Sequence, residues 1–113
     1  MKTASIYKDV TYNADKPMIT VMFETTFTKE IRIAMQQGTL MKKHKTPFPI
    51  VIQIIEGEIN FGVQEETLNL KKGELIALDG GIPHDLSAVS DSIIRLTLTK
   101  SDEINRVKTV INK

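Results

Sequence analysis

Two histidines, His44 and His84, are the residues of this 113-residue chain whose type is best suited to chemistry. An imidazole titrates near neutral pH, so it can act as a general acid or base, and its neutral nitrogen is a common metal ligand. The chain has no cysteine, which excludes disulfides, cysteine nucleophiles and thiolate metal sites. Because 40 positions separate the two histidines, only the fold can bring them together.

Glycines stand at regular distances from both histidines. Taken alone, each histidine is more often an ordinary surface or core residue, and the glycine spacing is what points to a site. Five residues separate Gly38 from His44. The sequence around the other histidine has a similar arrangement, with two residues between Gly81 and His84.

The first spacing resembles a motif of the cupin family: glycine, five residues, histidine, one residue, histidine, three or four residues, glutamate, six residues, glycine. Gly38, His44 and Gly57 match this motif. The position of the second histidine holds Thr46, and that of the glutamate holds Ile50. The resemblance therefore includes only one of the three metal-ligand positions in this motif.

The second spacing resembles the other cupin motif: glycine, five residues, proline, one residue, glycine, two residues, histidine, three residues, asparagine. Gly73, Gly81 and His84 match it, whereas Asp79 replaces the proline and Ala88 the asparagine. Together the motifs cover most of the chain. The resemblance implies an all-β fold, a cupin-type β-barrel also described as a double-stranded β-helix or jelly roll.

Metal-binding cupins typically use three histidines and one glutamate, so the resemblance implies an incomplete metal site with His44 and His84 as its ligands. No cofactor is certain; a divalent transition metal (Zn, Fe, Mn or Ni) would be bound weakly. A third ligand would have to come from elsewhere. Gln53 and Asp85 have the wrong strand parity for that role, and Asp79 lies in a turn.

The same positions predict a ligand-binding pocket formed by His44, Thr46, Ile50 and His84. Thr46 and Ile50 make this pocket more apolar than a complete metal site. The adjoining segment Lys42–Lys45 is a local positive cluster. It would attract an anionic ligand to the pocket mouth, although such clusters are more often solvated strand or loop edges.

The elements that must position these residues show a period of two, which predicts half-buried strands. Alternating stretches occur at 19–24, 31–36, 58–63, 68–70 and 94–99. Residues 50–55 are apolar on both faces apart from Gln53, which is typical of a strand covered on both sides or at an oligomer interface. Short strands separated by glycine-containing turns predict a β-sandwich or barrel.

We interpret the chain as one domain, since domains usually have roughly 100–200 residues. Residues 1–18 are an irregular N-terminal arm with a short edge strand near Ser5–Tyr7, and residues 19–100 are the barrel. Residues 101–113 are a short amphipathic C-terminal helix, with Ser101 as its cap.

Charge and hydropathy limit the classes of partner that we expect for this protein. The formal net charge is +1, which gives no electrostatic case for nucleic acid. No apolar run approaches the roughly 20 residues of a membrane span, and no signal-peptide core is visible. We therefore expect a cytoplasmic protein with neither nucleic-acid nor membrane partners.

Three functions stay open. The preferred one is a cupin domain that binds a small molecule in its barrel, similar to the sensor domains of some bacterial transcription regulators, although no helix-turn-helix segment is recognisable. The alternative is a metal-dependent cupin enzyme (isomerase, decarboxylase or dioxygenase type) that uses His44 and His84, or a metal-free enzyme with His84 as general base. The third is an interaction module. A homodimer fits all three, and catalytic residues cannot be assigned.

Overall fold

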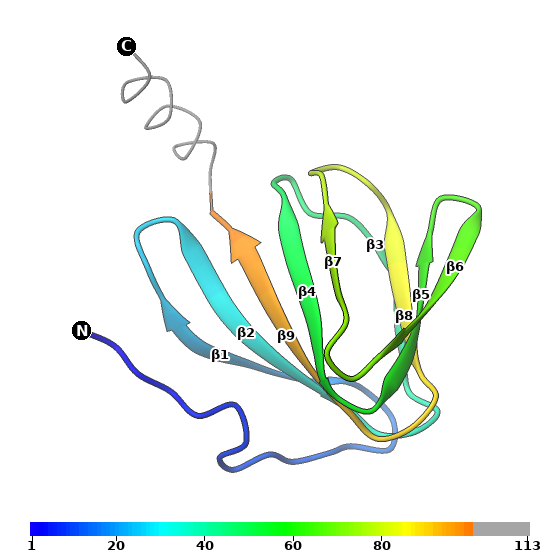
Figure 1. The fold of residues 1–113 in the computed structure, drawn as a ribbon, viewed down its shortest axis with the longest axis horizontal. Helices are drawn as coiled ribbons and strands as arrows, with labels where there is room; N and C mark the ends of the chain where they lie inside the picture. The colour runs from blue at the N-terminus through cyan, green and yellow to red at the C-terminus, as the bar shows by residue number, and fades with distance from the viewer. Residues whose placement is uncertain (101–113) are drawn as a thin grey trace.

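The computed structural model describes residues 1–100, and all regular secondary structure within that range is β-strand (Figure 1). The nine strands are β1 (Met18–Glu24), β2 (Thr28–Met35), β3 (Leu40–His44), β4 (Ile50–Glu56), β5 (Glu58–Val63), β6 (Glu66–Lys71), β7 (Leu75–Leu78), β8 (His84–Ala88) and β9 (Ser92–Thr99). The helix predicted for 101–113 lies outside the described residues.

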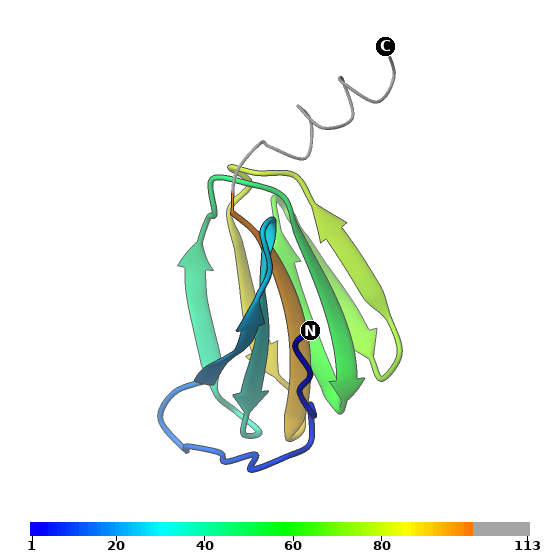
Figure 2. The ribbon, with the colours of Figure 1, turned by 90° about the vertical axis from the view of Figure 1, so that its left-hand side faces the viewer.

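The strands form two antiparallel sheets that face each other. One sheet has the order β1-β2-β9-β4-β7 and the other the order β3-β8-β5-β6. The chain crosses repeatedly between them, from β2 to β3, back to β4, and across again to β5 (Figure 2). This wound double sheet is the all-β jelly-roll barrel that the sequence predicted.

Alternating burial along the strands explains why this sequence forms two packed sheets. In β4, Ile50, Ile52 and Ile54 are buried while Val51 is exposed. Inward-facing aliphatic side chains from both sheets form one continuous core, which removes their apolar surface from water. The other members of this core are Ile31, Ile33, Met35, Ile59, Phe61, Leu70, Leu86, Ala88 and Ile94.

The N-terminal arm, residues 1–17, packs against the outer face of the five-stranded sheet. The Arg32 side chain donates hydrogen bonds to three carbonyls of the arm, and the Tyr7 hydroxyl donates to Oε1 of Glu56 at 2.8 Å. The expected edge strand near Ser5–Tyr7 is wrong, because residues 6–9 form a turn whose carbonyls bond to a side chain instead of a neighbouring strand. Strand β1 begins at Met18, one residue earlier than expected.

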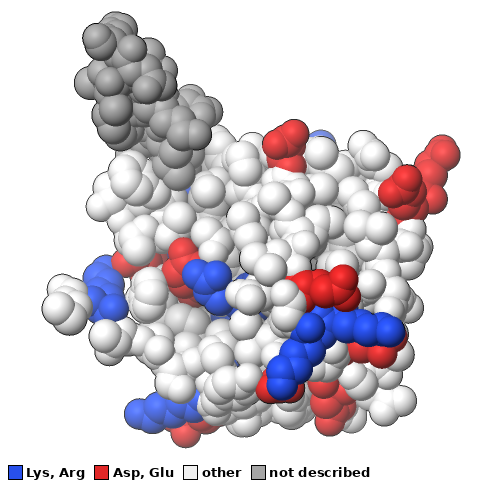
Figure 3. Space-filling view, in the orientation of Figure 1, with Lys and Arg blue, Asp and Glu red and all other residues white. Residues whose placement is uncertain are grey.

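Charged side chains of both signs lie next to one another on the face shown in Figure 3. Within residues 1–100, no helix is long and apolar enough to cross a membrane.

Candidate functional site

The two histidines meet although 40 positions separate them in the sequence. His44 ends β3 and His84 begins β8, and the two residues are direct partners in the antiparallel pairing of these strands. Their ring centroids lie 4.4 Å apart with an interplanar angle of 62°, an edge-to-face arrangement. His44 is exposed, whereas His84 lies behind it with only 2% of its surface exposed.

Backbone carbonyls determine which nitrogen of each imidazole carries the proton. Nδ1 of His44 lies 2.8 Å from the carbonyl oxygen of Lys42, and Nδ1 of His84 lies 3.0 Å from that of Ile82. A carbonyl oxygen only accepts hydrogen bonds, so each Nδ1 must be the donor. In the neutral state the proton is therefore on Nδ1, and each Nε2 keeps a lone pair for a ligand or a metal.

An aromatic ring on the neighbouring strand supports His84 from inside the barrel. The Phe61 ring stacks on the imidazole with centroids 5.5 Å apart and an interplanar angle of 13°. Phe61 is fully buried in β5. Burial of His84 lowers its pKa below the ordinary value, since desolvation disfavours the charged imidazolium. The nearby His44 lowers the pKa further, while the hydrogen bond to Ile82 and the charge of Asp85 act in the opposite direction.

Two loops that lie at the same end of the barrel hold the histidines in place (Figure 1). The loop 45–49 follows His44 and the loop 79–83 precedes His84. The amide of Gly81 donates a 2.7 Å hydrogen bond to the carbonyl of Thr46. A Cβ at Gly80 would collide with the carbonyl oxygen of Pro47, so the absence of a side chain at Gly80 permits this close approach.

The structure places the two remaining predicted pocket residues differently from the histidines. Thr46 lies in the loop after His44, where its hydroxyl donates a 3.0 Å hydrogen bond to the carbonyl of Phe48. Ile50 is the first residue of β4 in the facing sheet, and its side chain is buried in the core. It pairs with Leu98 of β9. The two histidines contact each other, whereas Thr46 lies in the loop after His44 and Ile50 lies in the hydrophobic core.

A groove of about 400 Å³ opens at the same end of the barrel. Thr46 and Phe48 line it, so it borders the loop that carries the chain away from His44. The other lining residues are Lys29, Lys45, Pro47, Leu98, Thr99 and Lys100. Lys29 and Lys100 both contact the carboxylate of Glu24. The ammonium group of Lys45 beside an apolar surface therefore makes this groove suitable for a molecule with both an apolar part and negative charge.

The donor set does not fit a tight metal centre. Within the described part of the chain, no group of three or more His, Cys, Asp or Glu side chains is placed to hold a metal. Asp85 lies against Gly62, because a Cβ added at Gly62 would collide with the carboxylate of Asp85. The side chain of Gln53 lies on the opposite face of β4 from the buried residues, as expected. Two imidazoles alone give one ligand fewer than a catalytic zinc site normally has.

Sequence reasoning missed several residues of this region. Phe61 was recognised only as a strand residue, because its stacking on His84 depends on the pairing of β5 with β8. Lys29 and Lys100 were missed because they lie at the ends of paired strands that are far apart in the sequence. The alternating pattern identified those strands, but no local signal showed that their ends flank the loop 45–49.

Comparison with known proteins agrees with this architecture. Residues 29–100 match the AraC-like ligand binding domain family. A search of curated proteins found no match.

Solved structures resemble the chain over nearly its whole length. An RmlC-like cupin protein from Desulfovibrio desulfuricans superposes with a TM-score of 0.80 at 19% identity, covering 88% of this chain and 96% of that one. A protein from Thermus thermophilus superposes with a TM-score of 0.79 at 22% identity, covering 89% of this chain and 100% of that one. A conserved protein of unknown function from Streptococcus pyogenes has a TM-score of 0.76 at 21% identity, with 88% of each chain covered. At these identities the structures show that the chain has the cupin fold, and the family match over residues 29–100 shows that it belongs to the AraC-like ligand binding domain family.

Proposed function

We propose that this domain binds a small molecule at the histidine end of the barrel. The observation that carries the proposal is the contact of His44 with His84, with both Nδ1 atoms bonded to backbone carbonyls. Each neutral imidazole then has an Nε2 acceptor for a donor such as a hydroxyl group. Membership in a ligand-binding domain family supports the same function.

The surroundings of the pair indicate the chemistry of the ligand. The adjoining groove contributes the apolar surfaces of Pro47, Phe48 and Leu98, together with the ammonium group of Lys45. We therefore propose a ligand that combines hydroxyl groups, which bond to imidazole, with a short apolar part or an anionic group, which occupies the groove. Thr46 and Ile50 form the adjacent wall in this proposal.

A thermal-shift screen of sugars, hydroxy acids and aromatic acids tests the proposal. A ligand at one hundred times its dissociation constant should add about 2.7 kcal/mol of stability. The His44→Ala variant should lose at least ten-fold in affinity for a hit, whereas Lys71→Ala, which removes an exposed side chain on β6, should bind as the wild type does. Failure of the whole panel, or equal binding by His44→Ala, would contradict the proposal.

The alternative function is a metal-dependent cupin enzyme in which His44 and His84 bind a Zn, Fe, Mn or Ni ion. The two free Nε2 atoms support weak binding of such an ion, and the missing third ligand is the argument against a tight centre within the described residues. An isomerase, decarboxylase or dioxygenase activity that requires added metal and both histidines would favour this alternative over simple binding.

We also propose that the domain forms a homodimer through the outer face of β4 and β7. Leu75 of β7 is 59% exposed there, and Val51 of β4, which pairs with Ala77, is 36% exposed. Burial of such side chains against a second copy would remove apolar surface from water. Light scattering should find a dimer that Leu75→Lys converts to a monomer, while Leu40→Lys, at an exposed position on β3, has no effect. A wild-type monomer at micromolar concentration would overturn this.

The cytoplasmic location and the expectation of neither nucleic-acid nor membrane partners stay predictions from the sequence.

A further inference from the structure

Two arginines lie side by side on the outer face of the five-stranded sheet. Arg32 of β2 and Arg95 of β9 are direct partners in the antiparallel pairing of these strands. Arg32 alternates with the core residues Ile31 and Ile33, so its side chain leaves the opposite face of the sheet. Like charges directly opposite each other destabilise a strand pair unless something compensates them.

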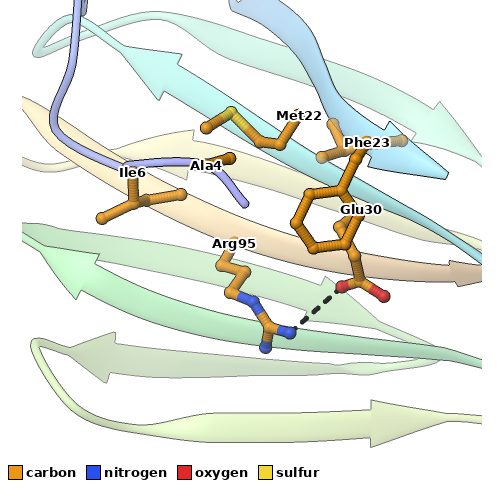
Figure 4. A pocket seen from close by; sticks show the side chains of 7 residues that line it. Ala4, Ile6, Met22, Phe23, Glu30 and Arg95 are labelled. Atoms are coloured by element: carbon orange, nitrogen blue, oxygen red, sulfur yellow. Dashed lines mark hydrogen bonds and ion pairs between the residues drawn. The ribbon is translucent and has the colours of Figure 1, made fainter. Parts of the chain in front are cut away.

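Arg95 has such compensation. Its guanidinium lies 3.1 Å from Oε1 of Glu30, in a largely apolar pocket of about 190 Å³ whose lining includes Ile6 of the arm (Figure 4). The hydroxyl of Thr97 donates a 2.6 Å hydrogen bond to the same carboxylate oxygen. The positive charge of Arg95 is therefore matched by a negative charge in direct contact.

Arg32 has no such partner within residues 1–100, where the ion pairs involve other residues. It is only 6% exposed. Its Nη1 donates to the carbonyls of Ile6 and Lys8, and its Nη2 to that of Asp9. Among the described residues, its remaining donor, Nε, is buried without a hydrogen-bond partner. A buried guanidinium with no counter-charge and one unused donor is costly, since charge and donor have both lost water.

A hollow of about 480 Å³ lies beside this guanidinium, between the arm and β1. Arg32 and Lys8 line it, with Asp9 as the one acidic residue in the described lining. Three residues that carry hydroxyl groups, Thr3, Ser5 and Thr20, line it as well. Two cations, one carboxylate and three hydroxyl donors leave a net positive site rich in donors, which is suited to a small oxyanion.

We propose that this hollow is a second binding site, distinct from the histidine end, and that it takes an oxyanion such as a phosphate or carboxylate group. The anion pairs electrostatically with the guanidinium of Arg32 and with the ammonium group of Lys8. It supplies the counter-charge that Glu30 provides for Arg95. Bound there, it also joins the arm to the sheet, because the lining comes from both.

NMR of the whole chain tests this site through the Nε–Hε signal of Arg32, observed while inorganic phosphate replaces chloride at constant ionic strength. We expect a saturable shift of that signal. Lys8→Gln should weaken phosphate binding at least three-fold, whereas the control Lys16→Gln, also in the arm, should leave it unchanged. Titration with acetate then distinguishes carboxylate from phosphate as the preferred group.

An unmoved Nε–Hε signal with both anions would overturn the proposal. So would a shift that does not saturate, or one that is equal in Lys8→Gln, since each means an adventitious ion only. The measurement needs no variant of Arg32. Such a variant is avoided because replacing the arginine would also remove the hydrogen bonds that hold the arm against the sheet. Because the signal lies far from His44 in the fold, on the outer face of the sheet, its outcome is independent of the function proposed for the barrel.

Discussion

The His44 and His84 rings meet edge to face at 4.4 Å, one exposed and the other almost completely buried. This contact follows from a register in which the last residue of β3 opposes the first residue of β8. The exposed ring is free to meet a ligand. The buried ring, held between Phe61 and His44, keeps the pair in one arrangement.

We expect His84 to make stability depend on pH. Its pKa is lowered in the folded state by burial, so the unfolded state binds the proton more readily. Stability is therefore complete above the unfolded pKa of about 6.5 and decreases as the pH falls from there toward the lower folded pKa. The free energy of unfolding, measured by urea denaturation, should fall more on acidification in the wild type than in His84→Gln. An equal decrease in both proteins would show that this imidazole is not the group responsible.

The histidine pair should bind a transition metal only weakly. Two imidazole ligands without a carboxylate placed beside them in the described residues favour an ion less than a three-ligand site does. Protein purified without a chelator or an affinity tag should therefore contain much less than one metal per chain, and His44→Ala should abolish the residual binding of added Zn²⁺ in calorimetry. Near-stoichiometric metal that His44→Ala removes would contradict this and identify a third ligand beyond those considered.

We expect ligand binding to depend on the absence of a side chain at Gly80. Alanine there would collide with the carbonyl of Pro47 and press on Phe48, which separates the two loops that hold the histidines. We expect Gly80→Ala to destabilise by about 1–3 kcal/mol and to weaken ligand binding at least ten-fold. Gly73→Ala is the control: its φ of +90° also strains a side chain, but the surrounding space is open. Equal loss of binding in both variants would indicate general destabilisation.

Ser92 should be the most costly small polar residue to replace. It is fully buried, and its hydroxyl accepts from the amide of Glu58 at 3.1 Å and lies 2.8 Å from the carbonyl of Ser90. Ser92→Ala leaves that amide unsatisfied, which should cost about 1–3 kcal/mol in denaturant unfolding. Ser87→Ala, at a half-buried position on β8, should change stability by less than about 0.5 kcal/mol. Similar values for both would refute the role given to Ser92.

The strands that alternate most clearly were predictable from sequence. In β9 and β5, Ile94 and Phe61 occupy inward positions within a regular pattern, and both are fully buried. Strand β3 carries no such pattern, because Lys42 and Lys43 follow one another at an exposed edge and both meet water. Periodicity therefore did not predict this strand.

The candidate site was predictable only in part. The glycine spacing identified His44 and His84, and the structure brings them together. It did not identify Phe61 or the lysines of the groove, since their proximity depends on strand pairing between distant segments. Arg32 was also missed, because a single arginine within an alternating strand is ordinarily a solvated outward residue; only the arm that covers it makes it buried.

The most direct test of the central claim is NMR titration of a screening hit while the imidazole signals of His44 and His84 are observed. The account predicts that both rings shift with the same saturation curve, and that Nδ1 of each keeps its proton. A hit that saturates while both imidazole signals stay unchanged would contradict ligand binding at the histidine end of the barrel.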